Sequence, residues 1–294
     1  MTRRGDTLLF DAPPTVAAWA AAGGKKESEG PLASAFDFVT QDAAFGEQGC
    51  ENWEQAESLL QRKAVELCLR KADIPRSKVD LAFAGDLQAQ CTASNYTMRE
   101  LGIPFAGVYG ACSTMAQGLA LGGVLVESGA AARLAVSASS HFCSAERQYR
   151  FPLAYGGQRT PTAQWTATAA GAAVLGAEGG SSVRMTHVLF GKMIELGVKD
   201  ANNMGAAMAM AALDTILQNF RDLGVDETHY DKIITGDLGT VGRRLLLDYL
   251  MKAGYRIESR YMDCGIEMFS PEEQDTHAGG SGCGCSAAVL CGFV

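Results

Sequence analysis

The sequence predicts an α/β protein built from two similar halves. Apolar runs typical of buried strands alternate with segments whose apolar residues recur at helical spacing. One phrase also occurs twice: a helix, a turn with Asp and Lys, an apolar strand and then Gly-Asp-Leu, at residues 85–87 and again at 236–238. The matching context favours an internal duplication, in which equivalent loops of the two halves meet at the centre of the molecule.

We expect the halves to span residues 1–180 and 181–294. Residues 1–50 are expected to be irregular, because Pro13-Pro14 and Gly30-Pro31 are turn signals, and Lys25–Glu29 is expected to be a solvated loop. The next predicted elements are a helix at 52–71, a strand at 79–84, a helix at 92–101, a strand at 103–109, a buried helix at 115–126, a strand at 133–139, a loop at 146–159 and a strand pair at 166–175 that turns at Gly171.

The second half is predicted to repeat this alternation of strands and helices. Its elements are a strand at 183–189, a helix at 203–222, a strand at 232–235, a helix at 243–252 and a small-residue run that opens at Gly279. Asp86, Cys112, Asp237 and the pair Gly280-Ser281 stand at equivalent turns. We therefore expect them to converge on one pocket.

Composition excludes several classes of protein. The formal net charge of −8 gives no basic footprint for nucleic acid. The sequence has no run of transmembrane length and no signal peptide, so we expect a cytoplasmic protein that reaches a membrane only through a partner. Nine cysteines, an odd number, indicate reduced thiols. Zinc is disfavoured, because Cys283 and Cys285 are separated by one residue and lack a second ligand pair.

Cys112 is the first candidate functional residue. It follows an apolar strand and Gly110, and it opens the predicted buried helix. The N-terminus of a helix offers free N–H groups and a partial positive charge, which stabilise a thiolate or a bound anion. The alternative is that Cys112 is only a small apolar residue at a tight corner.

Several phrases then resemble a known family. Two similar α/β halves, a cysteine at the start of a buried helix and a late Gly-rich turn are similar to the thiolase superfamily, which includes the ketoacyl synthases. Within it, the chain more closely resembles a family of thiolase-fold stage V sporulation proteins of endospore formers. The matching phrases are KKESEGPL (25–32), LAFAGDL (81–87), GACST (110–114), SSHFCSAERQ (139–148), YGGQ (155–158), TGDL (235–238) and AGGSGCGCS (278–286).

The resemblance implies a duplicated, layered thiolase-like fold with buried central helices, and a homodimer. It also implies a sporulation protein that binds dipicolinic acid, or its calcium chelate, and supports its uptake into the developing spore. The other stage V sporulation membrane proteins would be its partners, and it would lie on the cytoplasmic side, peripheral to the spore inner membrane. No catalytic reaction and no cofactor are implied, beyond calcium that arrives with the ligand.

Two departures from the superfamily matter. Where ketosynthases carry a catalytic His, this sequence has Asp237, and a carboxylate beside Cys112 would raise the pKa of the thiol. Relatives continue with further strands beyond the point equivalent to Val294, so we expect the last C-terminal strands to be lacking. The favoured hypothesis is a binding protein. The alternatives are an acyltransferase or ketosynthase that uses Cys112 as nucleophile, and a scaffold for membrane partners.

The candidate ligand-binding residues supply donors for two carboxylates or ligands for calcium. Serine, histidine and arginine side chains would bind the carboxylates, whereas the acidic residues would repel a free dianion unless calcium accompanied it. Each has a structural alternative: the acidic residues cap turns, the histidine is buried in the fold, and the arginines form ion pairs. The candidates are Asp86, Cys112, Ser139, Ser140, His141, Arg147, Asp237 and Ser281, with Arg150 and Arg159 as further arginines.

Overall fold

A six-stranded mixed sheet forms the centre of the protein. The structure is a computed structural model that describes residues 1–149, 159–176 and 181–294. The strand order is β4-β3-β9-β7-β5-β6; β9 is antiparallel to both its neighbours, and the other pairs are parallel. The strands are β3 (Thr15–Gly23), β4 (Phe38–Val39), β5 (Leu81–Gly85), β6 (Phe105–Gly107), β7 (Arg133–Ser140) and β9 (Ala169–Gly176).

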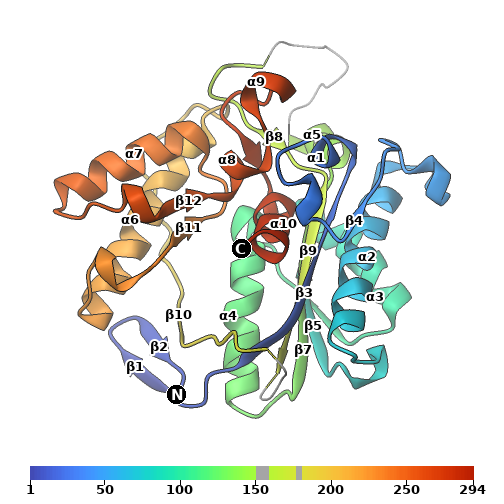
Figure 1. Cartoon of the computed structure of the whole chain (residues 1–294), viewed down its shortest axis with the longest axis horizontal. Coiled ribbons are helices and arrows are strands. Elements are labelled where there is room, and N and C mark those ends of the chain that lie inside the picture. Colours follow the sequence, from blue (N-terminus) through green and yellow to red (C-terminus); the bar gives the residue numbers. More distant parts are fainter. Residues whose placement is uncertain (150–158, 177–180) are drawn as a thin grey trace.

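Helices cover both faces of this sheet (Figure 1). On one face lie α2 (Trp53–Lys71) and α3 (Thr92–Leu101), and on the other lie α4 (Thr114–Glu127) and α10 (Cys283–Gly292). Alternate residues of β9 enter the two cores: Ala170 and Val174 face α2, whereas Ala169 and Ala173 face α4 and α10. A sheet covered on both faces has apolar residues at every position, which explains the unbroken apolar runs.

The contact between α10 and β9 is unusually close. A Cβ atom at Gly171 would lie 2.2 Å from the carbonyl oxygen of Ala287, and one at Gly284 would lie 2.2 Å from that of Ala169. The prediction of a strand pair turning at Gly171 is therefore wrong. Gly171 lies in the middle of the single strand β9, where its missing side chain makes room for α10.

The central helix α4 is buried on one side only. Its small residues Gly118 and Gly122 pack on the sheet, where an added Cβ would lie within 3 Å of Val136 or Leu134 side chains. Leu121, in contrast, is only partly buried. The prediction of a fully buried helix is correct for the sheet side alone.

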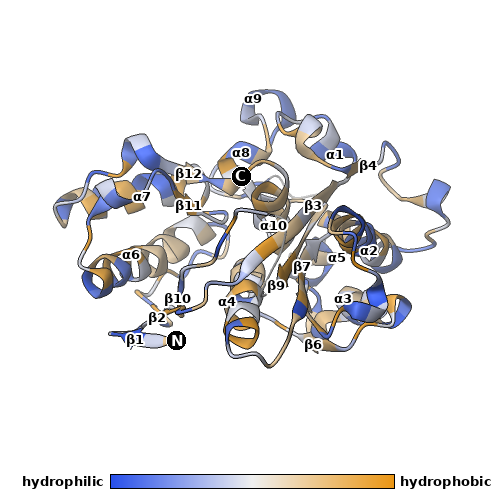
Figure 2. Ribbon diagram, turned by 60° about the horizontal axis from the view of Figure 1, so that its bottom comes forward, coloured by the Kyte–Doolittle hydropathy of each residue, from blue (hydrophilic) through white to orange (hydrophobic). Residues whose placement is uncertain are grey.

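The second half adds a parallel strand pair and two long helices. β11 (Ile233–Thr235) pairs with β12 (Tyr261–Asp263), as β5 pairs with β6 in the first half, and α6 (Met204–Leu223) packs on α7 (Gly239–Lys252). Figure 2 shows these two amphipathic helices beside the strand pair. The two Gly-Asp-Leu phrases thus follow equivalent strands, as the repeat predicts.

The remaining elements are short. They comprise the antiparallel sheet β1 (Thr2–Arg4), β2 (Thr7–Leu9) and β10 (His187–Leu189), the pair β8 (Trp165–Thr166) and β13 (Gly280–Ser281), the helices α1 (Lys25–Ser28), α5 (Phe142–Tyr149), α8 (Cys264–Met268) and α9 (Pro271–Gln274), and 3₁₀ turns at Ala33–Ala35, Gly46–Gln48, Arg76–Lys78, Ala89–Cys91, Ala111–Ser113, Glu227–His229 and Glu258–Arg260. None of the helices described is both long enough and apolar enough to cross a lipid bilayer.

Three local predictions are wrong. Residues 1–50 are not irregular, because the alanine-rich β3 lies inside the central sheet, where small side chains fit between two closely packed helix layers. Lys25–Glu29 is not a solvated loop, since Glu27 is 1% exposed and accepts a hydrogen bond from the Thr168 N–H. Residues 146–149 belong to α5, and the remainder of that predicted loop, 150–158, lies outside the described residues.

The close approach at Gly171 gives a stability prediction. Gly171→Ala should lower the free energy of unfolding by more than about 3 kcal/mol, because the new methyl group meets backbone atoms of α10. Gly107→Ala is the matched control, since a Cβ there meets no atom nearer than 3.4 Å and should change stability by less than about 1 kcal/mol. Urea unfolding measures both. Equal effects would contradict the packing described.

Candidate functional site

Cys112 lies at the corner where β6 leads into α4. The residue before it, Ala111, has a φ of 47°, a left-handed conformation that is strained for a residue with a Cβ. The backbone carbonyl of Cys112 accepts a hydrogen bond from the Ser286 hydroxyl of α10 at 3.2 Å. The corner is therefore held from the second half of the chain.

The structure brings three predicted residues together. The Cys112 thiol lies close to the Asp237 carboxyl group, to Ser281 and to the backbone N–H of Gly282, and these groups influence the pKa of the thiol. The same N–H donates to Asp237 Oδ2 at 2.8 Å. Asp237 follows β11, and Ser281 ends β13. This Cys112–Asp237–Ser281 junction joins the two halves, as expected from the repeated turns.

The electrostatics of the junction do not activate the thiol. Burial raises the pKa of Cys112 well above its ordinary value, and the negative charge of Asp237 raises it further. Burial also raises the pKa of Asp237, to about 6. Because its pKa is raised, Cys112 is a neutral thiol at neutral pH. A nucleophilic cysteine needs the opposite, a lowered pKa.

Two further residues hold this junction, and the sequence analysis missed both. Gln164 Nε2 donates to the backbone oxygens of Asp237 and Gly280, at 2.7 and 2.8 Å. Asp263 accepts from the N–H groups of Leu238 and Gly239. Asp263 is the N-cap residue of α8, and an Asp at a helix start is a sequence signal that could have been found. No sequence pattern around Gln164 marks that residue.

Asp86 lies at the end of β5 and is completely buried. Its carboxyl group accepts from the Gln88 N–H at 2.9 Å, and from the N–H and hydroxyl of Ser94 in α3. These are the turn and helix-capping contacts of the structural alternative. Asp86 nevertheless lies near the junction, since it is close enough to the buried Cys283 thiol, which follows Gly282, for its charge to raise the pKa of that thiol.

The predicted cluster at the end of β7 is buried and internally bonded. The Ser139 hydroxyl donates to Glu57 at 3.2 Å, and that of Ser140 donates to the Ala167 carbonyl at 2.6 Å. His141 Nδ1 accepts from the Cys143 N–H, and burial lowers the pKa of His141 to about 4. His141 is therefore neutral, and these contacts match a structural role.

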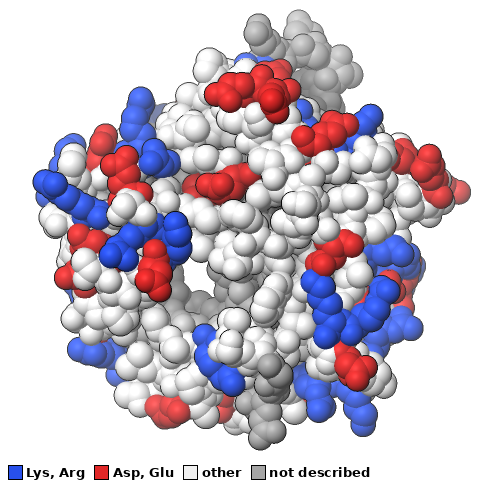
Figure 3. All heavy atoms as spheres, in the orientation of Figure 1, with Lys and Arg blue, Asp and Glu red and all other residues white. Residues whose placement is uncertain are grey.

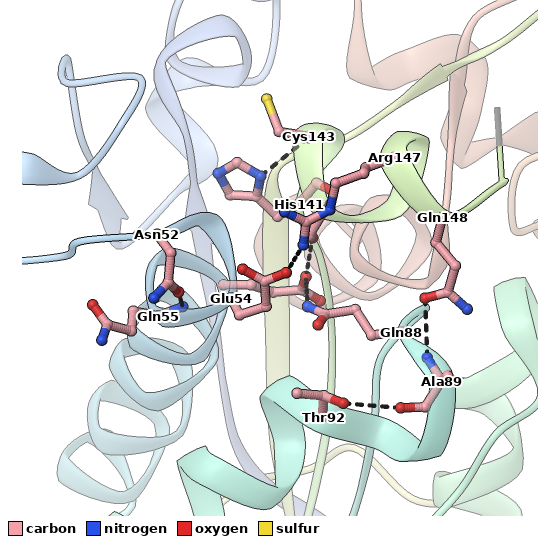
Figure 4. Close-up of polar contacts among 12 residues, drawn as sticks. Asn52, Glu54, Gln55, Gln88, Ala89, Thr92, His141, Cys143, Arg147 and Gln148 are labelled. Atoms are coloured by element: carbon pink, nitrogen blue, oxygen red, sulfur yellow. Dashed lines mark hydrogen bonds and ion pairs between the residues drawn. The ribbon is translucent and has the colours of Figure 1, made fainter. Parts of the chain in front are cut away.

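The two arginine candidates that the structure describes make their contacts with residues other than Cys112. Arg147 forms an ion pair with Glu54 (Figure 4). Its guanidinium group also lies 5.3 Å from the centre of the Trp53 ring. Arg159 lies over the Trp165 ring and donates to the carbonyl of Gln164. Arg150 and the YGGQ phrase at 155–158 lie outside the described residues.

Three observations bear on the chemistry of the site. Within residues 1–149, 159–176 and 181–294, no group of three or more His, Cys, Asp or Glu side chains has an arrangement that could hold a metal ion. A cavity of about 640 Å³ lies between the start of α2 and α3, away from Cys112, and is lined by residues such as Gln55, Arg62 and Tyr96. The face in Figure 3 carries charges of both signs, with no basic patch for nucleic acid.

Solved structures share the fold. One is 3-oxoacyl-(acyl carrier protein) synthase III, FabH, from Pseudomonas aeruginosa PAO1, with a TM-score of 0.56 and 17% identity, covering 95% of this chain and 88% of that one. Another is cerulenin-bound OleA from Xanthomonas campestris, with a TM-score of 0.60 and 16% identity, covering 99% and 90%. At these identities the likeness shows a thiolase-like condensing-enzyme fold and nothing more.

Sequence comparison gives the family. The family model "Stage V sporulation protein AD (SpoVAD)" matches residues 4–294. The stage V sporulation protein AD of Bacillus subtilis (strain 168) is 42% identical over 285 residues, which cover 96% of this chain and 82% of that protein. With the thiolase-like fold and the junction of its two halves, the chain belongs to the stage V sporulation protein AD family.

Proposed function

We propose that the protein binds dipicolinic acid, as the free acid or as its calcium chelate, at the Cys112–Asp237–Ser281 junction, and does so without catalysis. The binding serves uptake of dipicolinic acid into the developing spore, with the stage V sporulation membrane proteins as partners and the chain peripheral to the inner membrane. The observation that carries the proposal is the junction itself, where a condensing-enzyme fold holds a neutral thiol against a carboxyl group.

The surroundings of the junction suit a small planar acid. The N-terminal ends of α4 and α10 both lie there, and the partial positive charge of helix N-termini favours carboxylates. Beside it, Tyr109 and Tyr149 are each more than half exposed and share a hydrogen bond of 2.8 Å, and both hydroxyls reach the carbonyl of Leu87. Exposed rings held in this way offer an apolar surface for a pyridine ring.

The charge balance favours the calcium chelate. Asp86, Asp237 and Asp263 are all buried near the junction, and no ion pair of the described residues neutralises them. A free dianion would be repelled, whereas a chelate brings its own positive charge and leaves Ca²⁺ able to accept further oxygen ligands.

The first test of the proposal is a calorimetric titration with dipicolinate. Binding should be saturable and tighter with calcium, and Ser281→Ala and Cys112→Ala should each weaken it about fivefold, the worth of one lost hydrogen bond. Cys50→Ala, which changes a partly exposed thiol outside the junction, is the matched control and should bind as the wild type does. A folded wild type that binds no dipicolinate, with or without calcium, would contradict the proposal.

An acyltransferase that uses Cys112 as nucleophile is the second candidate, since FabH and OleA share the fold.

The alkylation rate of Cys112 distinguishes the two candidates. Our proposal predicts that iodoacetamide alkylates Cys112 at pH 7.5 at least about tenfold more slowly than a free thiol, because the raised pKa leaves little thiolate. Asp237→Asn should speed the alkylation, since it removes the negative charge that raises the pKa of Cys112. Mass spectrometry of the Cys112 peptide measures both rates. A stable acyl adduct formed from acyl-CoA would favour the enzyme instead.

A further inference from the structure

Glu57 is a buried acid that no sequence motif marked. It lies in the middle of α2 with 0% exposure, on the face that packs against the central sheet. Two charged side chains near Glu57 in α2 have partners elsewhere, since Glu54 pairs with Arg147 and Arg62 pairs with Glu100. Among the residues that the structure describes, Glu57 takes part in no ion pair.

Its hydrogen bonds provide a place for a proton. The Ser144 hydroxyl lies 2.7 Å from Glu57 Oε2 and 3.1 Å from the carbonyl oxygen of His141. Ser144 can therefore donate to that carbonyl and accept a proton from Glu57. Gln88 Nε2 donates to the same carboxyl oxygen at 2.6 Å, and the Ser139 hydroxyl approaches Oε1. A neutral carboxylic acid satisfies all of these contacts.

Gln88 connects Glu57 to Asp86. Its side chain binds Glu57, while its backbone N–H donates to Asp86 Oδ1 at 2.9 Å. Ser139 makes a second connection, because its hydroxyl binds Glu57 and its carbonyl accepts from the Cys283 thiol at 3.0 Å. Glu57 is thus connected through Gln88 and Ser139 to Asp86 and Cys283, which lie next to the junction.

Among the residues that the structure describes, the groups that face this pair supply no positive charge. Burial raises the pKa of Glu57 to about 8, with the charge of Asp86 as the second cause, and burial also raises the pKa of Asp86. Burial lowers the pKa of His141 to about 4, so that it is neutral. The titratable groups facing the pair from the surrounding elements are Cys91, His141, Tyr149 and Cys283, and Arg147 is paired with Glu54.

We propose that Glu57 and Asp86 act as a coupled pair of acids that share one proton, held by Glu57 at neutral pH. This side of the junction then carries one negative charge, and it gains a second only when the pH rises. The shared proton is independent of the proposed function, whereas the consequence for dipicolinate rests on it: binding of a dianion weakens as the second charge appears.

Infrared titration tests the shared proton directly. At pH 7 the wild type should show the carbonyl stretch of a protonated carboxylic acid that Glu57→Gln removes, and this band should disappear with a midpoint near pH 8. Glu54→Gln, one turn earlier in the same helix, is the matched control and should leave the band unchanged. In Asp86→Asn the midpoint should fall by about one unit or more, because the repelling charge is gone.

Three results would overturn the pair: no such band at pH 7, a band that Glu57→Gln leaves in place, or a midpoint that Asp86→Asn does not move. The last comparison keeps the test decisive if Glu57→Gln fails to fold.

Titration with dipicolinate in the absence of calcium, at pH 7 and pH 9, tests the link to the ligand. The wild type should bind about fivefold more weakly at pH 9, and Glu57→Gln should bind equally at both values. Equal wild-type affinity at the two pH values, or binding only when calcium is present, would refute the link. Absence of binding both with and without calcium, with the infrared band present, would refute the proposed function and leave the acid pair standing.

Discussion

The close packing of α10 on the central sheet is the constraint on which the rest of the structure depends. Gly171 and Gly284 remove two side chains at the contact, so that backbone meets backbone between β9 and the helix. The helix belongs to the second half, and the sheet belongs to the first. Because Gly282 is the N-cap residue of α10, this packing places the N–H of Gly282 against Asp237 and Cys112, and the junction forms there.

The same packing explains what the sequence could predict. The repeated Gly-Asp-Leu phrase and the cysteine at a helix start correctly placed Cys112, Asp237 and Ser281 together, since strand ends and helix starts follow from local patterns. The long helices α2, α3 and α6 were predicted nearly to the residue for the same reason. The alanine-rich β3 and the glycine inside β9 were missed, because a strand between closely packed helix layers selects small residues that carry no strand signal.

Side-chain pairing was less predictable than backbone position. Arg147 was expected to bind a ligand, but its partner Glu54 lies in a helix distant in sequence. Glu57 and Gln61 stand on the apolar face of α2, at helical spacing with Leu60 and Ala64, and a polar residue on such a face is a usable signal. Gln164 acts through two backbone carbonyls, and contacts of that kind leave no trace in a sequence.

Buried acids that form no ion pair with any described residue define the chemistry of the junction. Such groups keep their protons or require a cation from outside, and either solution suits the proposed binding of a chelated dicarboxylate better than the activation of a thiol. A crystal structure of the protein with calcium and dipicolinate tests this claim most directly. The account predicts the ligand at the junction, with carboxylate oxygens in contact with Ser281. Ligand bound only in the cavity between α2 and α3 would contradict it.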